Sequence, residues 1–388
     1  MSDDSPAPRH LSVLLSVRPY LGHLHPMIPL ARALLRRGHR VAVATSEDVA
    51  EIVVGAGLAW IPAGMNPRQT PELSATDPDY GYMTVKAKVD DLLALAIGDF
   101  RPDVIVRDPT DLAPIVVSEL VGALNVIYGL SRFIPKESWE VLGADRTIAR
   151  LRRHYRLPED AGLESMFSGL YLAVLPPLLE VQNPLPVELV QPIAYVPWDG
   201  DERDAEALPD HRAEGRPQVL VTLGTVYNVE TDLLARFVEA FRDGEVDVLV
   251  ALGEGADPGI TEGAPENVRF SRYLPFTKVL PRCDALLCHG GFNTVMSALL
   301  AGVPTVCVPL GSDHDHNAYI CRREGFGIWL DEAEASPERI RQAVATVIRD
   351  RGYAERVRAF RRQLAAAPPL DTAVRRIEQL VEVRETTP

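Results

Sequence analysis

The stretch Cys283–Ala318, with the sequence CDALLCHGGFNTVMSALLAGVPTVCVPLGSDHDHNA, decides the fold class of this chain. It begins with a short apolar run that is typical of a strand buried on both faces, and a His-Gly-Gly turn interrupts the run. Apolar residues at helical spacing follow the turn, and Gly302 ends them ahead of a second apolar run. The pattern predicts, in order, a strand at 285–288, a helix capped by Asn293 or Thr294, a strand at 305–309 and a polar loop.

This β-α-β unit provides a phosphate-sized site at the start of its helix. The N–H groups of a helix's first turn and the positive end of the helix dipole favour an anion there. The two glycines of the turn let such an anion approach the backbone closely. The alternative is a purely structural crossover, which does not require His289, Thr294, Asp313 and Asn317 together.

Composition excludes several classes of protein. The chain has 388 residues, 46% hydrophobic and 24% charged, so two globular domains of about 150–200 residues each are expected. Its formal charge of −14 argues against nucleic acid as the main partner, because nucleic-acid binding needs a basic surface. Residues 1–10 are polar and resemble no signal peptide, and no apolar run is long enough for a membrane span. The four cysteines fit buried free thiols in a reducing cytoplasm.

Strands and helices alternate along the chain, which predicts parallel, doubly wound sheets. The acidic segment 198–216 has Gly and Pro but no periodicity, so it is expected to separate two α/β domains. The predicted domains are 1–200 and 217–365, with a linker at 201–216 and a terminal helix within 366–388. Strands are expected at 11–17, 40–45, 59–62, 104–107, 125–128, 170–175, 191–196, 218–223, 246–252, 267–273, 285–288 and 305–309.

Together with Asp313-His314 and Asn317-Ala318, the His-Gly-Gly turn resembles the donor-binding signature of nucleotide-sugar glycosyltransferases with the GT-B fold, in particular their bacterial natural-product branch. The resemblance implies an α/β protein of two Rossmann-like, doubly wound domains that face a cleft. The first domain would bind the acceptor, and the second the nucleotide-sugar donor. The terminal helix would either stay with the second domain or cross back to the first.

The segment Gly22-His23-Leu24-His25-Pro26 looks like the N-terminal motif of the same family. We expect residues 18–23 to form a loop and Pro26 to occupy the first position of a helix. The resemblance implies that His23 is the general base for an acceptor hydroxyl, a task that suits a neutral imidazole. His25 is the neighbouring alternative, and a capping or solvated histidine is the other interpretation.

Asp108 lies at the end of the strand expected at 104–107. A carboxylate there can fix the tautomer of an imidazole and stabilise the imidazolium, which would complete a His-Asp dyad with His23. The family has such a partner at this point of the chain. Arg107 and Asp111 flank Asp108, so an ion pair or a helix N-cap is the rival interpretation.

The resemblance also implies which residues bind the donor. The diphosphate would lie at the turn that begins with His289, and a Leu-Gly-Thr turn after the strand at 218–223 would reach the same phosphates. The loop at 274–276 resembles the family's base-binding loop, although its aromatic residue could equally belong to the core. The candidate donor-binding residues are Gly224, Thr225, Phe276, His289, Gly290, Gly291, Asn293, Thr294, Ser297, Asp313 and His314.

Two positions depart from the common pattern of the family. Ser297 stands where many relatives carry a Glu that grips ribose hydroxyls, which favours dTDP over UDP. His314 replaces the Gln of the usual Asp-Gln pair that binds sugar hydroxyls. A site built to hydrogen-bond particular hydroxyls discriminates strongly among sugars, so this replacement favours a sugar other than glucose, such as a deoxysugar.

The expected reaction is inverting, metal-independent hexosyl transfer from a dTDP-sugar to a hydroxyl of an apolar natural product, such as a polyketide or antibiotic aglycone. Backbone dipoles at the helix N-terminus would stabilise the leaving diphosphate, so neither a metal nor a cofactor is expected. Residues 313–316 could also be a metal cluster, but no further ligand set accompanies them. The alternatives are a sugar-nucleotide epimerase or hydrolase of the same fold, a UDP-sugar donor, and a non-catalytic protein that keeps the fold. Whether the chain forms a homodimer is left open.

Overall fold

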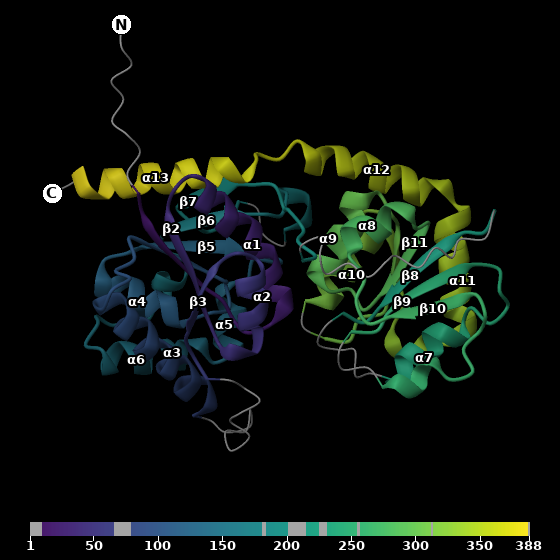
Figure 1. Cartoon of the computed structure of the whole chain (residues 1–388), viewed down its shortest axis with the longest axis horizontal. Coiled ribbons are helices and arrows are strands. Elements are labelled where there is room, and N and C mark those ends of the chain that lie inside the picture. Colours follow the sequence, from purple (N-terminus) through teal and green to yellow (C-terminus); the bar gives the residue numbers. More distant parts are fainter. Residues whose placement is uncertain are drawn as a thin grey trace, which may run out of the picture. The chain divides into compact units, whose positions relative to one another are not determined.

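A computed structural model describes residues 10–65, 79–180, 184–200, 215–224, 231–253, 257–311 and 313–386. Contacts divide the chain into two units, the first made of Met1–Val196 with Pro368–Pro388 and the second of Pro197–Ala367. Each unit contains one parallel sheet with helices packed on it (Figure 1). Most of the linker predicted at 201–216 lies outside the described residues, which resume at residue 215.

The sheet of the first unit has the strand order β3-β2-β1-β4-β5-β6-β7. Its strands are β1 (Ser12–Ser16), β2 (Arg40–Thr45), β3 (Ala59–Pro62), β4 (Val104–Arg107), β5 (Leu124–Gly129), β6 (Leu170–Ala173) and β7 (Leu189–Pro192). Its helices are α1 (Leu21–Arg36), α2 (Ala50–Gly55), α3 (Tyr80–Ile97), α4 (Ala113–Val121), α5 (Lys136–Val141), α6 (Ala144–His154) and α13 (Leu370–Thr386). The strand order changes direction between β1 and β4, which is where doubly wound sheets bind their ligands.

The sheet of the second unit has the order β10-β9-β8-β11-β12-β13, with its change of direction between β8 and β11. Its strands are β8 (Gln218–Thr222), β9 (Asp247–Ala251), β10 (Val268–Ser271), β11 (Ala285–Cys288), β12 (Thr305–Cys307) and β13 (Gly327–Trp329). Its helices are α7 (Thr231–Glu239), α8 (Phe276–Val279), α9 (Phe292–Ala301), α10 (His314–Arg323), α11 (Pro337–Arg349) and α12 (Arg351–Ala365).

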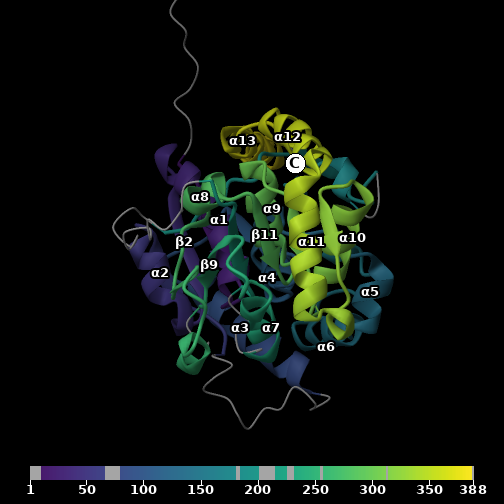
Figure 2. The same ribbon diagram turned by 90° about the vertical axis from the view of Figure 1, so that its right-hand side faces the viewer.

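Apolar side chains from strands and helices fill a core in each unit. Leu14, Ile105 and Val116 belong to a core cluster of the first unit, and Phe237 and Leu287 to that of the second. Helix α11 packs against β11, β12 and β13 (Figure 2). Within the described ranges, no helix has both the length and the apolar character that a membrane span requires.

The first helix begins earlier than we predicted. Helix α1 starts at Leu21, so His23 lies in its first turn rather than in a loop, and Pro26 and Pro29 lie inside the helix. Each internal proline removes one backbone hydrogen bond, which is why the sequence pattern favoured a later start. Packing outweighs this loss, because Pro26 and the neighbouring Leu24 are buried.

Two predictions in the second unit are also wrong. The residue before helix α9 is Gly291, so neither Asn293 nor Thr294 occupies the capping position. The segment after β12 was expected to be a polar loop, but α10 begins within it at His314. The first residues of this helix are polar, so its apolar periodicity becomes visible only further along, at the buried Ile320 and neighbouring positions. Strand β13 was not predicted, because three residues are too few to give a periodic pattern.

The terminal helix α13 belongs to the first unit and contacts α1. Its polar contacts centre on Glu378, which accepts a hydrogen bond of 2.8 Å from Arg37 Nη2. Its buried face consists of Leu370, Ala373, Val374, Ile377 and Val381. An apolar stripe and a partly exposed ion pair therefore hold the last helix on the first unit.

Candidate active site

Predicted site residues lie in both units at the point where the strand order changes direction. In the first unit, His23 follows β1 and Asp108 follows β4. In the second, Gly224 follows β8 and His289 follows β11. The two pairs therefore occupy the same place in two sheets of the same kind, and that place is the usual binding position of a doubly wound sheet.

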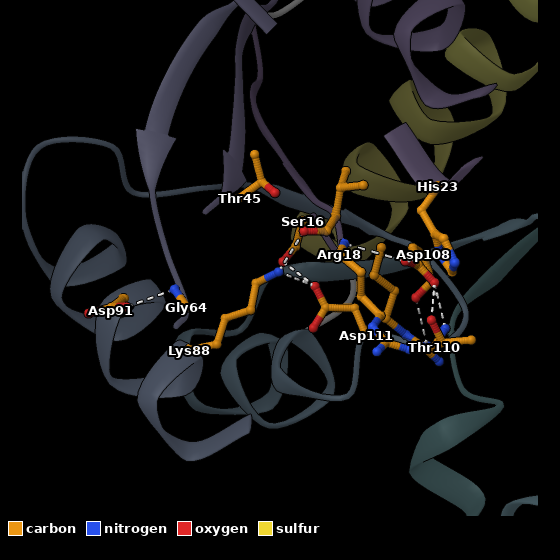
Figure 3. A network of polar contacts seen from close by, with 12 residues as sticks. Ser16, Arg18, His23, Thr45, Gly64, Lys88, Asp91, Asp108, Thr110 and Asp111 are labelled. Atoms are coloured by element: carbon orange, nitrogen blue, oxygen red, sulfur yellow. Dashed lines mark hydrogen bonds and ion pairs between the residues drawn. The ribbon is translucent and has the colours of Figure 1, made fainter. Parts of the chain in front are cut away.

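His23 and Asp108 form a hydrogen-bonded pair. Their strands are parallel neighbours, and His23 Nδ1 lies 2.7 Å from Asp108 Oδ2 (Figure 3). The Asp108 side chain is fully buried, whereas that of His23 is 26% exposed. Because the carboxylate accepts this hydrogen bond, the proton of a neutral imidazole lies on Nδ1, and Nε2 remains a proton acceptor.

Further donors hold the Asp108 carboxylate in place. Its Oδ1 accepts hydrogen bonds of 2.7 Å from both the backbone N–H and the hydroxyl of Thr110. Its Oδ2 also accepts a longer one, of 3.4 Å, from the Arg18 backbone. Burial alone would raise the pKa of Asp108, but His23, Thr110 and Arg18 together hold it well below its usual range. The carboxylate is therefore ionised at neutral pH.

Neither rival interpretation of Asp108, an ion pair with Arg107 or a helix N-cap, agrees with its hydrogen bonds. Arg107 is fully buried, and its guanidinium donates to the backbone carbonyls of Pro109, at 2.9 Å, and Met166, at 2.6 Å. Burial lowers the pKa of Arg107 to about 10, against the attraction of Asp111 and Asp108. The residue before helix α4 is Leu112, so Asp108 is not its N-cap.

His25, the alternative base, lies two positions further along α1. Burial lowers the pKa of His25 to about 4, so it is neutral at pH 7. It is His23, and not His25, that contacts Asp108, and this contact leaves Nε2 as the nitrogen of His23 that can take a proton.

In the second unit, the His289 ring fits tightly between glycines. A Cβ on Gly224 would lie 2.6 Å from His289 Cε1, and one on Gly291 would lie still closer to the ring. The His289 ring also makes an edge-to-face contact with the His314 ring, with ring centroids 4.6 Å apart. Burial and then His314 lower the pKa of His289 to about 3, although a hydrogen bond with the Thr222 backbone raises it. His289 is therefore neutral at any physiological pH.

Asn317 connects the loop after β11 to the loop after β12. Its Nδ2 donates to Gly290 O at 2.9 Å and to Asp313 Oδ2 at 3.1 Å. Leu310 N–H donates to His314 Nδ1 at 3.4 Å. The structure thus brings together Gly224, His289, Gly290, Gly291, Asp313 and His314 from our predicted donor site.

The remaining predicted donor residues lie on α9 and α8. Asn293, Thr294 and Ser297 are on α9, which starts at Phe292, and the side chains of Thr294 and Ser297 are buried. Phe276 is half-buried at the start of α8, a helix that contacts α9. Thr225 lies outside the described residues. In the portions of the chain that are described, no group of three or more His, Cys, Asp or Glu side chains is arranged to hold a metal ion.

Sequence reasoning missed the residues that support the dyad. Thr110 could have been found, because a Thr two positions after an Asp often closes a local turn. Lys88 and Ser16 both contact Asp111 next to the dyad, and no motif marks them.

Comparison with known proteins agrees with this architecture. Residues 235–380 match the family described as Erythromycin biosynthesis protein CIII-like, C-terminal domain. L-demethylnoviosyl transferase of Streptomyces niveus is 30% identical over 92% of this chain and 93% of its own length. Aclacinomycin-T 2-deoxy-L-fucose transferase of Streptomyces galilaeus is 26% identical over 95% of this chain and 96% of its own. The solved glycosyltransferase SnogD from Streptomyces nogalater matches with a TM-score of 0.77 and 27% identity, over 96% of this chain and 100% of its own.

Two Rossmann-like units with these structural neighbours define the GT-B fold, which confirms the predicted fold class. The chain belongs to the family of natural-product glycosyltransferases, and it is a glycosyltransferase.

Proposed function

We propose that this glycosyltransferase moves a sugar from a dTDP-sugar to a hydroxyl of an apolar natural product, with inversion at the anomeric carbon and without a metal or cofactor. The 2.7 Å contact between His23 and Asp108 supports the proposal most directly. It leaves His23 Nε2 as a proton acceptor on a partly exposed ring, which is the form that a general base requires.

In the proposed reaction, His23 Nε2 takes the proton of the acceptor hydroxyl. The acceptor oxygen attacks the anomeric carbon while the bond to the diphosphate breaks, through an oxocarbenium-like state. A single displacement of this kind inverts the configuration. Asp108 stabilises the imidazolium that forms, as an ionised carboxylate does in other His-Asp pairs. The acceptor's proton ends on His23, and the bonding electrons leave with the nucleoside diphosphate.

The start of α9 is the proposed diphosphate site. The helix dipole and the N–H groups of its first turn favour negative charge. They also stabilise the charge that builds on the leaving oxygen, so no metal is needed in this mechanism. Neutral His289 next to this turn adds a hydrogen-bonding group without a charge. Two observations support a dTDP-deoxysugar: the serine at position 297, and the name of the relative from S. galilaeus, a 2-deoxy-L-fucose transferase.

The test compares wild type with His23→Ala and Asp108→Asn, using dTDP-glucose and dTDP-rhamnose as donors and hydroxylated aromatic aglycones as acceptors. We expect His23→Ala to lower acceptor glycosylation by roughly a hundredfold or more, and Asp108→Asn by a smaller factor, with dTDP binding retained. Near-normal turnover by His23→Ala would show that the base has been misassigned. NMR of the product reports the anomeric configuration, and EDTA should leave the rate unchanged.

The same experiment separates the alternatives. A sugar-nucleotide hydrolase or epimerase would consume the donor equally fast with no acceptor present. A stronger thermal stabilisation by UDP than by dTDP would favour a UDP-sugar donor, because stabilisation grows with the ratio of ligand concentration to Kd.

A further inference from the structure

A buried ion pair lies next to the proposed dyad and has no part in the chemistry described so far. Lys88, on α3, is 8% exposed, and its Nζ donates to Asp111 Oδ2 at 2.5 Å and to Val17 O at 2.9 Å. Asp111 is 4% exposed, and its Oδ2 also accepts a 2.7 Å hydrogen bond from Ser16 Oγ. A buried ion pair is weak support for stability, because the loss of hydration offsets the attraction between the charges.

The pair joins the two chain segments that carry the dyad. Ser16 and Val17 lead from β1 towards α1 and His23. Asp111 follows Asp108 on the loop between β4 and α4, and Asp111 N–H donates to Asp108 O at 3.1 Å. The backbone N–H of Asp108 in turn donates to Ser16 O at 3.2 Å. These contacts therefore couple the segment that leads to His23 with the loop that carries Asp108.

The two carboxylates of this loop face different partners. Figure 3 shows Asp111 turned to Lys88 and Ser16, and Asp108 turned to His23 and Thr110. The loop is thus fixed on one side by the proposed catalytic contact and on the other by the ion pair. Without Lys88, the buried Asp111 carboxylate would lose the cation that donates a hydrogen bond to it and would keep only the attraction of Arg107, so it would be expected to move towards water.

The Lys88 side chain has little freedom to leave. Gly64, after β3, lies against its stem, and a Cβ at Gly64 would come within 3.3 Å of Lys88 Cδ. The Gly64 N–H also donates to Asp91 Oδ2 of α3 at 2.8 Å. Helix α3 and the end of β3 therefore hold the ammonium group beneath the dyad loops.

We propose that Lys88 is a positioning residue: through Asp111 and Ser16 it fixes the β1–α1 and β4–α4 segments so that His23 and Asp108 stay in hydrogen-bonding register. The inference rests on the proposed role of the dyad. Small displacements of a general base are costly in rate, so this support should be visible in turnover rather than in donor binding.

The test is a double-variant cycle of Lys88→Met and His23→Ala, measured with dTDP-rhamnose and an aromatic aglycone. We expect Lys88→Met to lower kcat by roughly tenfold to a hundredfold, with the donor KM and the thermal shift by dTDP unchanged. In a His23→Ala background the same change should cost less than about twofold, because residues that act as one unit are not additive. Lys88→Arg should restore part of the rate.

The control is Lys86→Met on the same helix. Lys86 pairs with Asp90 at 2.6 Å on the surface, so its loss removes an ion pair of similar geometry away from the dyad and should leave kcat unchanged. If Lys88→Met does not fold, Ser16→Ala removes one hydrogen bond to Asp111 and should lower kcat by about twofold to fivefold.

Each other outcome has one meaning. The positioning role would be overturned if Lys88→Met kept the wild-type kcat while His23→Ala was inactive, and the proposed function would stay intact. If only Ser16→Ala folds, a wild-type kcat in that variant would have the same meaning. Equal losses with and without His23 would show a general structural role instead. An active His23→Ala would show that the base has been misassigned, and the positioning role of Lys88 would be overturned with it.

Discussion

His39 and Glu378, 339 positions apart in the sequence, meet at 3.1 Å between Nε2 and Oε1. The backbone N–H of Leu11 donates to the other ring nitrogen of His39, at 3.2 Å, so the imidazole proton lies on Nε2 and is donated to Glu378. One neutral histidine thereby joins the start of β1 to helix α13. Arg37 shares the same carboxylate.

Replacing Glu378 should loosen the last helix. Glu378→Ala leaves the buried Nε2 proton of His39 without its acceptor, which typically costs about 1–3 kcal/mol of unfolding free energy. Urea denaturation measures that loss, and limited proteolysis should cut the variant within 370–386 sooner than the wild type. Glu382→Ala is the matched control, because residue 382 lies one turn further on and is exposed. Equal effects of the two variants would contradict the role of this contact.

A methyl group at Gly224 should abolish nucleotide binding. The residue has φ of +73°, and its Cβ would meet the His289 ring, so Gly224→Ala combines backbone strain with a displaced imidazole. Gly244 has φ of +72° and open space around its Cβ, so Gly244→Ala carries the strain alone. Gly244→Ala should lose about 1–2 kcal/mol of stability and Gly224→Ala at least as much, but only Gly224→Ala should lose the thermal shift by dTDP. A normal shift in Gly224→Ala would show that the His289 ring is not part of the donor site.

The protein should lose stability in mild acid. Burial lowers the pKa of His289 to about 3 and that of His25 to about 4, from 6.5 in the unfolded chain. The unfolded state therefore binds more protons below pH 6.5, so the unfolding free energy falls as pH drops towards 4, by up to about 1.4 kcal/mol per pH unit for each group. His289→Asn should flatten this slope, whereas His154→Asn, at an exposed position, should not. Identical slopes in wild type and His289→Asn would rule the explanation out.

Native cysteines should be unreactive. All four are free and buried, and Cys288 Sγ lies 3.9 Å from Cys307 Sγ. Hydrogen bonding between thiols, together with burial, raises the pKa of Cys307 and Cys321, and a thiol rather than a thiolate is a poor nucleophile. A colorimetric thiol reagent should therefore detect no cysteine in the folded protein and four in denaturant. Rapid labelling of any thiol under native conditions would contradict the buried arrangement.

The strands could be predicted closely because parallel strands buried on both faces are continuous apolar runs. β4 at Val104–Arg107 and β11 at Ala285–Cys288 match the predicted ranges to the residue. His23 and Asp108 were chosen by resemblance to a motif, while their contact over 85 positions depends on β1 and β4 being neighbours. Helix boundaries were less predictable, because local rules for proline and for polar runs do not include tertiary packing.

Lys88 shows what sequence patterns leave out. It shares one apolar face of α3 with Val85, Val89 and Leu92, of which Val89 and Leu92 are fully buried. A lysine on such a face signals a buried charge, but its partner, Asp111, lies 23 positions away on another loop. Only the fold identifies that partner and its place beside Asp108.

The first unit is discontinuous in sequence, since it takes up residues 368–388 after the whole of the second unit has intervened. During synthesis on the ribosome, domains generally fold as they emerge, with the N-terminal one first. Here most of the first unit emerges first. It cannot bury the apolar surface of α1, or give the His39 Nε2 proton its acceptor, until helix α13 has been synthesised. A chain that ends at residue 367 would therefore contain the whole of the second unit but an incomplete first unit.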